Sequence, residues 1–212
     1  MIPSPTIAAR VARRLVLAVL VGLPACGLFG PREVSSINAS ADSAASFGSL
    51  PDVVLLDAKG EAVGPGRLRG STWALALLSR PIRFQTRAMS EALGQLSTAL
   101  EGTDLRLVSL SLDPLEDTPE SLAGYAEKVG ADSDTWMLWT GPEPSVYRLM
   151  QAAYRSVLVD VAEVEMEAIM ERSFESHVVV IDAEGRVRGA YDLFADGGPA
   201  AILNRLRAVA RE

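Results

Sequence analysis

The sequence predicts an α/β domain of three layers, in which helices cover both faces of a mixed sheet. Apolar runs typical of strands alternate with segments whose apolar residues recur every three or four positions, as in amphipathic helices. The alternation ends in two strand-like runs joined by a short turn, which predicts an antiparallel hairpin. A chain of 212 residues, 49% of them hydrophobic, is long enough for one such core plus extensions.

The first half of the domain is expected to begin with two short strands around the turn in "DVVLLDAKGEAV". The continuous apolar run "STWALALLS" predicts a central strand covered on both faces. In "FQTRAMSEALGQLSTALEG" the residues Met89, Leu93, Leu96 and Leu100 share one face of a helix that ends near Gly102. The run "LRLVSLSL" predicts the next strand.

The second half is expected to start with a helix near Pro119, with Thr118 as its N-cap. A short strand in "DTWMLWTG", a helix in "EPSVYRLMQAAY", a hairpin in "HVVVIDAEGRVRGAYD" and a closing helix in "GPAAILNRLRAVA" follow. This order of strands and helices is that of a thioredoxin-like fold.

The N-terminus is expected to be a signal peptide over residues 1–26, with the basic stretch "RVARR" before the apolar stretch "LVLAVLVGL". The only cysteine, Cys26, lies in "LPACG", which resembles a bacterial lipobox, so we expect lipidation at Cys26. The alternatives are an ordinary cleaved signal and an uncleaved anchor, in both of which the cysteine is incidental. Residues 27–48, rich in Ser and Ala, predict a flexible tether, and residues 49–212 the folded domain.

The charge of the chain argues against a nucleic-acid partner. The formal net charge is −7, and no basic stripe with interleaved aromatic residues is visible. Binding to phosphates needs clustered cations, so we expect no nucleic-acid binding.

Four pieces of the sequence resemble the Sco/SenC family of thioredoxin-like copper proteins. They are "LLDAKGEAV", the strand, turn and helix around Arg80, the phrase "SLDPLEDTPESLAGYA", and "SHVVVIDAEGRV". The third piece is the most specific, although Glu116 stands where the family usually has arginine. The resemblance covers most of residues 51–192 and implies a thioredoxin-like fold.

Members of this family typically hold copper with two cysteines of a C-x-x-x-C turn and one distant histidine. The resemblance places that turn in "SRPIRFQTR", which offers only hydroxyl, amide and guanidinium groups and therefore no soft ligand for Cu(I). Thiol–disulfide exchange requires a thiolate, and the predicted domain has no cysteine. We therefore expect no thiol–disulfide oxidoreductase activity.

His177, the only histidine, matches the position of the family's histidine. One imidazole does not make a tight metal site, so further ligands would be needed. Met166 and Met170 are spaced to share one helical face, where methionine more often fills a core than binds a metal. His177 is thus a structural remnant, a partner contact, or part of a weak copper site with these methionines.

An acidic cluster after the strand "LRLVSLSL" has two interpretations. Its carboxylates could hold a hard cation with oxygen ligands. The simpler interpretation is that Asp113 and Asp117 shape a turn and Glu120 favours the first turn of a helix.

The resemblance implies a setting in the maturation of respiratory copper sites, including that of cytochrome oxidase. We expect a non-enzymatic binding or assembly factor, lipid-anchored in the bacterial cell envelope and facing the periplasm or the exterior. Its partner, a copper-assembly protein or an oxidase subunit, would contact the surface around Arg80, Arg83, Phe84 and His177. No resident cofactor is expected, and copper is the ligand under the alternative of a weak Cu(I) carrier. A third hypothesis is an enzyme with unrelated, non-thiol chemistry in the same cleft.

Overall fold

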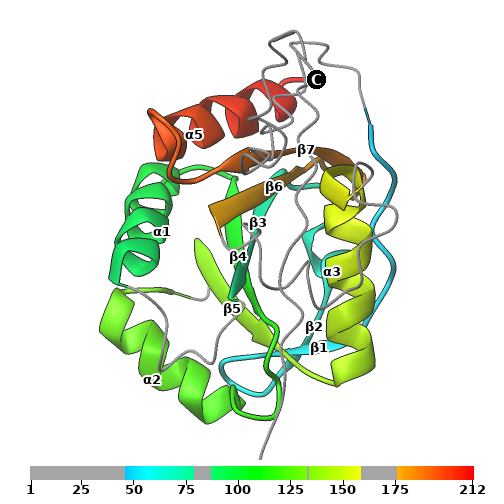
Figure 1. Ribbon diagram of the computed structural model, residues 1–212, viewed down its shortest axis with the longest axis vertical. Coiled ribbons are helices and arrows are strands. Elements are labelled where there is room, and N and C mark those ends of the chain that lie inside the picture. The colour runs from blue at the N-terminus through cyan, green and yellow to red at the C-terminus, as the bar shows by residue number, and fades with distance from the viewer. Residues whose placement is uncertain (1–45, 79–86, 133, 159–175) are drawn as a thin grey trace, which may run out of the picture. The chain divides into compact units, whose positions relative to one another are not determined.

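The fold is an α/β arrangement in which helices flank a central sheet (Figure 1). The computed structural model describes residues 46–78, 87–132, 134–158 and 176–212. The strands are β1 (Leu55–Asp57), β2 (Ala62–Val63), β3 (Trp73–Leu78), β4 (Arg106–Ser111), β5 (Trp136–Thr140), β6 (His177–Ile181) and β7 (Val187–Asp192). The helices are the 3-10 helix η1 (Pro65–Leu68) and the α-helices α1 (Arg87–Leu100), α2 (Pro119–Val129), α3 (Glu143–Leu158) and α5 (Gly198–Val209).

The seven strands form one sheet in the order β2-β1-β5-β4-β3-β6-β7. Strands β3, β4 and β5 are parallel, whereas β1 is antiparallel to β5 and β6 is antiparallel to β3. Strand β7 closes one edge by antiparallel pairing with β6. The mixed sheet and the terminal hairpin predicted from the sequence are therefore confirmed.

Two hydrophobic cores lie on the two faces of the sheet. Helices α1, α2 and α5 cover one face, and α3 covers the other together with the segment that carries Leu50 and Val53 (Figure 1). All six residues of β3 are buried, because this strand lies in the middle of the sheet and contributes side chains to both cores. This position explains the continuous apolar run in the sequence.

Helix α2 has the boundaries that its sequence predicts. The Thr118 hydroxyl accepts a hydrogen bond of 3.4 Å from the backbone N–H of Ser121, and Pro119 is the first helical residue. The helix ends at Gly130, whose φ of 72° lies in the left-handed region that favours glycine. Helix α3 extends four residues beyond the predicted segment, to Leu158.

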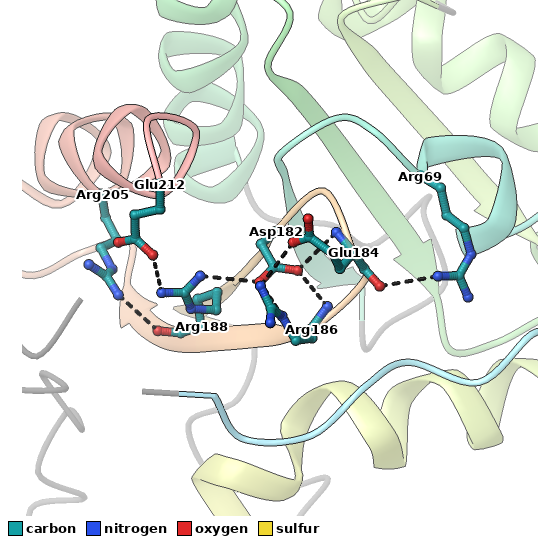
Figure 2. A network of polar contacts seen from close by, with 7 residues as sticks. All are labelled: Arg69, Asp182, Glu184, Arg186, Arg188, Arg205 and Glu212. Atoms are coloured by element: carbon teal, nitrogen blue, oxygen red, sulfur yellow. Dashed lines mark hydrogen bonds and ion pairs between the residues drawn. The ribbon is translucent and has the colours of Figure 1, made fainter. Parts of the chain in front are cut away.

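A network of charged side chains ties the β6–β7 hairpin to the segment after α5 (Figure 2). The Oδ2 atom of Asp182 accepts hydrogen bonds from Nε of Arg186 at 2.8 Å and from Nη1 of Arg188 at 3.1 Å. Arg188 also forms an ion pair with Glu212, and Arg69 donates to the backbone carbonyl of Glu184 at 3.1 Å. Asp182 and Arg188 are both buried, so each charge depends on the other for stabilisation.

The expected signal peptide and the lipidation site Cys26 lie outside the described residues. Within the part of the chain that the structure describes, no helix has the length and apolar character needed to cross a bilayer.

Candidate functional site

The candidate site lies at one end of the sheet, where several strands end and β6 begins. The register pairs Leu78 with Ser111 and His177 with Asp192, which places the last residues of β3, β4 and β7 at the same end as the first residue of β6. The β3–β6 register reaches Ala76 opposite Val178, so His177 lies beside the C-terminal end of β3. We call this region the His177 end of the sheet.

His177 is the first residue of β6, as the sequence predicts, and its side chain is directed into the protein rather than into solvent. Only 4% of the residue is exposed. The ring Nδ1 lies 3.3 Å from the hydroxyl of Ser176. A buried imidazole offers almost no surface to a protein partner.

Tyr154 of α3 fixes the backbone at this position. Its hydroxyl donates a hydrogen bond of 2.8 Å to the backbone carbonyl of His177 and lies 3.4 Å from the carbonyl of Leu75. Burial raises the pKa of Tyr154, so the phenol stays protonated and able to donate. The tyrosine therefore links α3 to both central strands, β3 and β6.

The acidic loop after β4 is a hydrogen-bonded turn. The backbone carbonyl of Asp113 accepts from the N–H groups of Glu116 at 3.1 Å and Asp117 at 2.8 Å. The carboxylate of Asp117, in a residue that is 1% exposed, accepts a hydrogen bond of 2.5 Å from the hydroxyl of Ser111. These contacts favour the turn interpretation of the acidic residues over a cation site.

Glu120 has the predicted location in the first turn of α2. Hydrogen bonds from its own backbone N–H and from the Thr118 hydroxyl lower the pKa of the exposed Glu120 carboxyl. A carboxylate at this location also interacts favourably with the positive end of the helix dipole. The residue therefore supports the start of α2.

Two large apolar side chains are exposed on loops at the His177 end. Leu115 lies in the turn after β4 and is 84% exposed, and Phe194 follows β7 and is 52% exposed. The backbone N–H of Phe194 is held by Asp192, whose Oδ1 accepts at 2.9 Å. Sequence reasoning missed both residues. The one sign in the sequence is that neither residue belongs to the apolar repeat of a predicted strand or helix.

Most of the sequence-predicted site residues lie outside the described residues. These are Cys26, Arg80, Arg83, Phe84, Met166 and Met170. The structure therefore places only His177 among the predicted metal or partner-binding residues.

The described residues do not provide the donor set that a bound copper ion would need. Among them, no group of three or more His, Cys, Asp and Glu residues is positioned to hold a metal ion. His177 is the single imidazole of the chain, and its nearby Ser176 hydroxyl is not a soft ligand.

Comparison with known proteins gives one family and a common fold. The family model described as SCO1/SenC matches residues 50–211. A SCO1/SenC family lipoprotein from Bacillus anthracis str. Ames is 20% identical, with 76% of this chain and 95% of that chain covered and a TM-score of 0.61. No curated protein matches the sequence at a significant level.

Two further solved structures have the same fold. BsSco, a member of the Sco family of cytochrome c oxidase assembly proteins for which a disulfide switch is identified, is 17% identical over 79% of this chain and 97% of its own, with a TM-score of 0.62. Copper-bound Sco1 of yeast is 19% identical over 76% of this chain and 94% of its own, with a TM-score of 0.52. At these identities the likeness concerns the fold.

Proposed function

Because this chain belongs to the SCO1/SenC family, whose model matches residues 50–211, we propose that it is a non-redox binding or assembly factor for a respiratory copper site. The observation that carries the proposal concerns which residues stand where members of the family typically bind copper. The histidine position is retained as a buried residue, His177, whereas the sequence has no cysteine after Cys26. Without thiolates the protein would act by binding rather than by thiol chemistry.

The partner would dock on the His177 end of the sheet. Exposed apolar side chains surrounded by polar residues are typical of binding sites, and Leu115 and Phe194 supply two of them on loops at the same end of the sheet. The loops that carry them follow β4 and β7, which are separated by β3 and β6. The two strands are therefore about 14 Å apart at the spacing of adjacent strands. Arg80, Arg83 and Phe84 would extend this surface, since their segment follows β3 directly.

The partner would be an oxidase subunit or another protein of copper-site assembly. BsSco belongs to a family of cytochrome c oxidase assembly proteins, and this relationship supports the choice of partner class. Lipidation at Cys26 would place the domain at the surface of a membrane in the cell envelope. The similarity to a lipoprotein of Bacillus anthracis str. Ames supports that location.

A copper titration tests the part of the proposal in which the protein itself binds no copper. Full-length protein in detergent is titrated with Cu(I) against a competing chelator without oxygen, with Cu(II) as a control and wild type beside His177→Ala. We expect no stoichiometric Cu(I) binding. Tight binding that His177→Ala abolishes would contradict the proposal and support a copper carrier, in which case Met166→Ala and Met170→Ala identify the remaining ligands.

A binding assay tests the docking surface. The copper-bearing oxidase subunit is immobilised, and its affinity is measured for the wild type and for a Leu115→Glu, Phe194→Glu double variant. Charges placed at the centre of an apolar contact should weaken binding at least about tenfold. Val54→Glu is the matched control, because Val54 is also an exposed apolar residue, at 65%, but lies beside β1. Equal binding by all three proteins would contradict this surface.

A further inference from the structure

Within the described residues, strand β5 has an incompletely paired edge. On one side, the neighbouring strand β4 pairs with residues 136–139 of β5. On the other side, β1 is in register only with Trp139 and Thr140. Residues 136–138 therefore have no partner in β1, although β5 is an internal strand of the sheet.

The edge is left open because β1 ends early in a tight turn. The Oδ1 atom of Asp57 accepts hydrogen bonds from the backbone N–H groups of Lys59 at 2.8 Å and Glu61 at 2.9 Å. Gly60, with a φ of 78°, donates its N–H to the carbonyl of Asp57 at 3.0 Å. These contacts direct the chain away from β5 and into β2.

A cavity of about 410 Å³ lies along this edge. Its walls are the β1–β2 turn, the second half of α2 and the start of β5, and its size is within the range of ligand-binding pockets. Small side chains line the part of the cavity next to α2 and the turn: Ala58, Ala123, Ala126 and Ala131. Short side chains leave room for a backbone to approach the strand edge.

The cavity is predominantly acidic. Five carboxylates line it, against the cationic side chains of Lys59 and Arg67; the carboxylates are Asp57, Glu61, Glu127, Asp132 and Asp134. Within the described parts of the chain these carboxylates do not form a cluster that could hold a metal ion. Negative charge spread around an elongated edge is complementary to several cations along an extended ligand.

We propose that this cavity binds an extended, Lys- or Arg-rich segment of a partner protein, which adds to the open edge of β5. A peptide supplies both properties that the cavity lacks: backbone groups for the strand edge and positive charge for the acidic rim. A polyamine would supply only the charge. The site is separate from the His177 end, because residues 136–138 lie at the opposite end of the parallel strands.

The test uses a fluorescent peptide, acetyl-KVKVKVK-amide, and the full-length protein in detergent. Binding is measured by fluorescence anisotropy, and the backbone amide signals of residues 136–138 are followed by nuclear magnetic resonance in the same titration. We expect saturable binding, a shift of those signals, and a rise in Kd of about fivefold to tenfold for Glu61→Gln with Glu127→Gln. The matched control is Glu101→Gln with Glu143→Gln, which changes the net charge equally at exposed residues outside the cavity.

A second peptide separates strand addition from general attraction to an acidic protein. The same sequence methylated at every backbone amide keeps its charges but cannot donate to the strand edge. We expect it to bind at least about tenfold more weakly. Equal binding of both peptides, equal effects of the two double variants, or no change in the backbone amide signals of residues 136–138 would overturn the proposal. These results leave the assay of the His177 end unaffected.

Discussion

The Tyr154 hydroxyl and the backbone carbonyl of His177 are joined by a hydrogen bond of 2.8 Å. The bond connects α3, on one face of the sheet, to the first residue of β6. Both residues are buried, so water cannot replace the phenol as donor without a rearrangement. The position of His177 therefore depends on α3 as well as on the pairing of β6.

Replacing Tyr154 by phenylalanine should destabilise the protein. The variant removes one hydrogen bond to a buried carbonyl, and such a bond is worth about 0.5 to 1.5 kcal/mol. Urea denaturation measures the free energy of unfolding. Tyr147→Phe is the control, since it removes a hydroxyl from a half-buried tyrosine of the same helix for which no hydrogen bond is found within the described residues. Equal losses in both variants would mean that the hydrogen bond to His177 contributes nothing specific.

Ser111→Ala should cost more stability than Ser109→Ala, although both serines are fully buried in β4. Ser111 donates to the buried carboxylate of Asp117, and hydrogen bonds to charged groups are worth about 1.5 to 3 kcal/mol. Ser109 accepts from the neutral indole of Trp136, a bond worth about 0.5 to 1.5 kcal/mol. Thermal or urea unfolding of the two variants gives the order, and the reverse order would contradict a charged Asp117.

The fold could be predicted from the sequence because its local signals agree with its tertiary contacts. The six buried residues of β3 form an unbroken apolar run, and the Thr118 cap and Gly130 mark the two ends of α2. The helical face of Met89, Leu93, Leu96 and Leu100 is buried as its period predicts. Only the ends of elements differed, as for α3, where packing rather than local sequence decides the boundary.

The candidate site was less predictable, because its contacts join residues far apart in the sequence. Nothing near Tyr154 indicates that its hydroxyl reaches His177, and nothing near Ser111 indicates a buried partner at Asp117. The exposure of Leu115 depends on the path of a turn rather than on a period. The open edge of β5 likewise follows from where β1 ends, which is a property of the whole sheet.

Arg188→Met should be far more destabilising than Arg186→Met, although both arginines bind Asp182 (Figure 2). The Arg188 side chain is 4% exposed, and removing one member of a buried ion pair costs about 3 to 5 kcal/mol. The Arg186 side chain is 46% exposed, so its ion pair is worth about 0 to 1 kcal/mol. Urea denaturation at neutral pH compares the two, and similar losses would show that burial does not govern this network.

Asp182 should make the stability of the protein depend on pH in the acidic range. Burial of its carboxyl raises the pKa, but hydrogen bonds from the Arg186 backbone and from the side chains of Arg186 and Arg188 outweigh it, so the pKa falls below the ordinary value of 3.8. A carboxyl whose pKa is lower in the folded state stabilises that state above its unfolded pKa. The contribution is lost as pH falls through the folded value.

The free energy of unfolding of wild type and Asp182→Asn should therefore differ by a constant amount from about pH 5 upwards. The difference should shrink as the pH is lowered below about 4, because wild-type Asp182 becomes protonated and loses its advantage over asparagine. Urea denaturation between about pH 2.5 and 7 measures both proteins. Asp104→Asn, at an exposed residue outside the network, controls for the general effect of removing a carboxylate. A difference that stays constant down to the lowest pH would mean that the carboxyl has the same pKa in the folded and unfolded states, and a difference that grows would mean that folding raises the pKa. Either result would contradict a lowered pKa of Asp182.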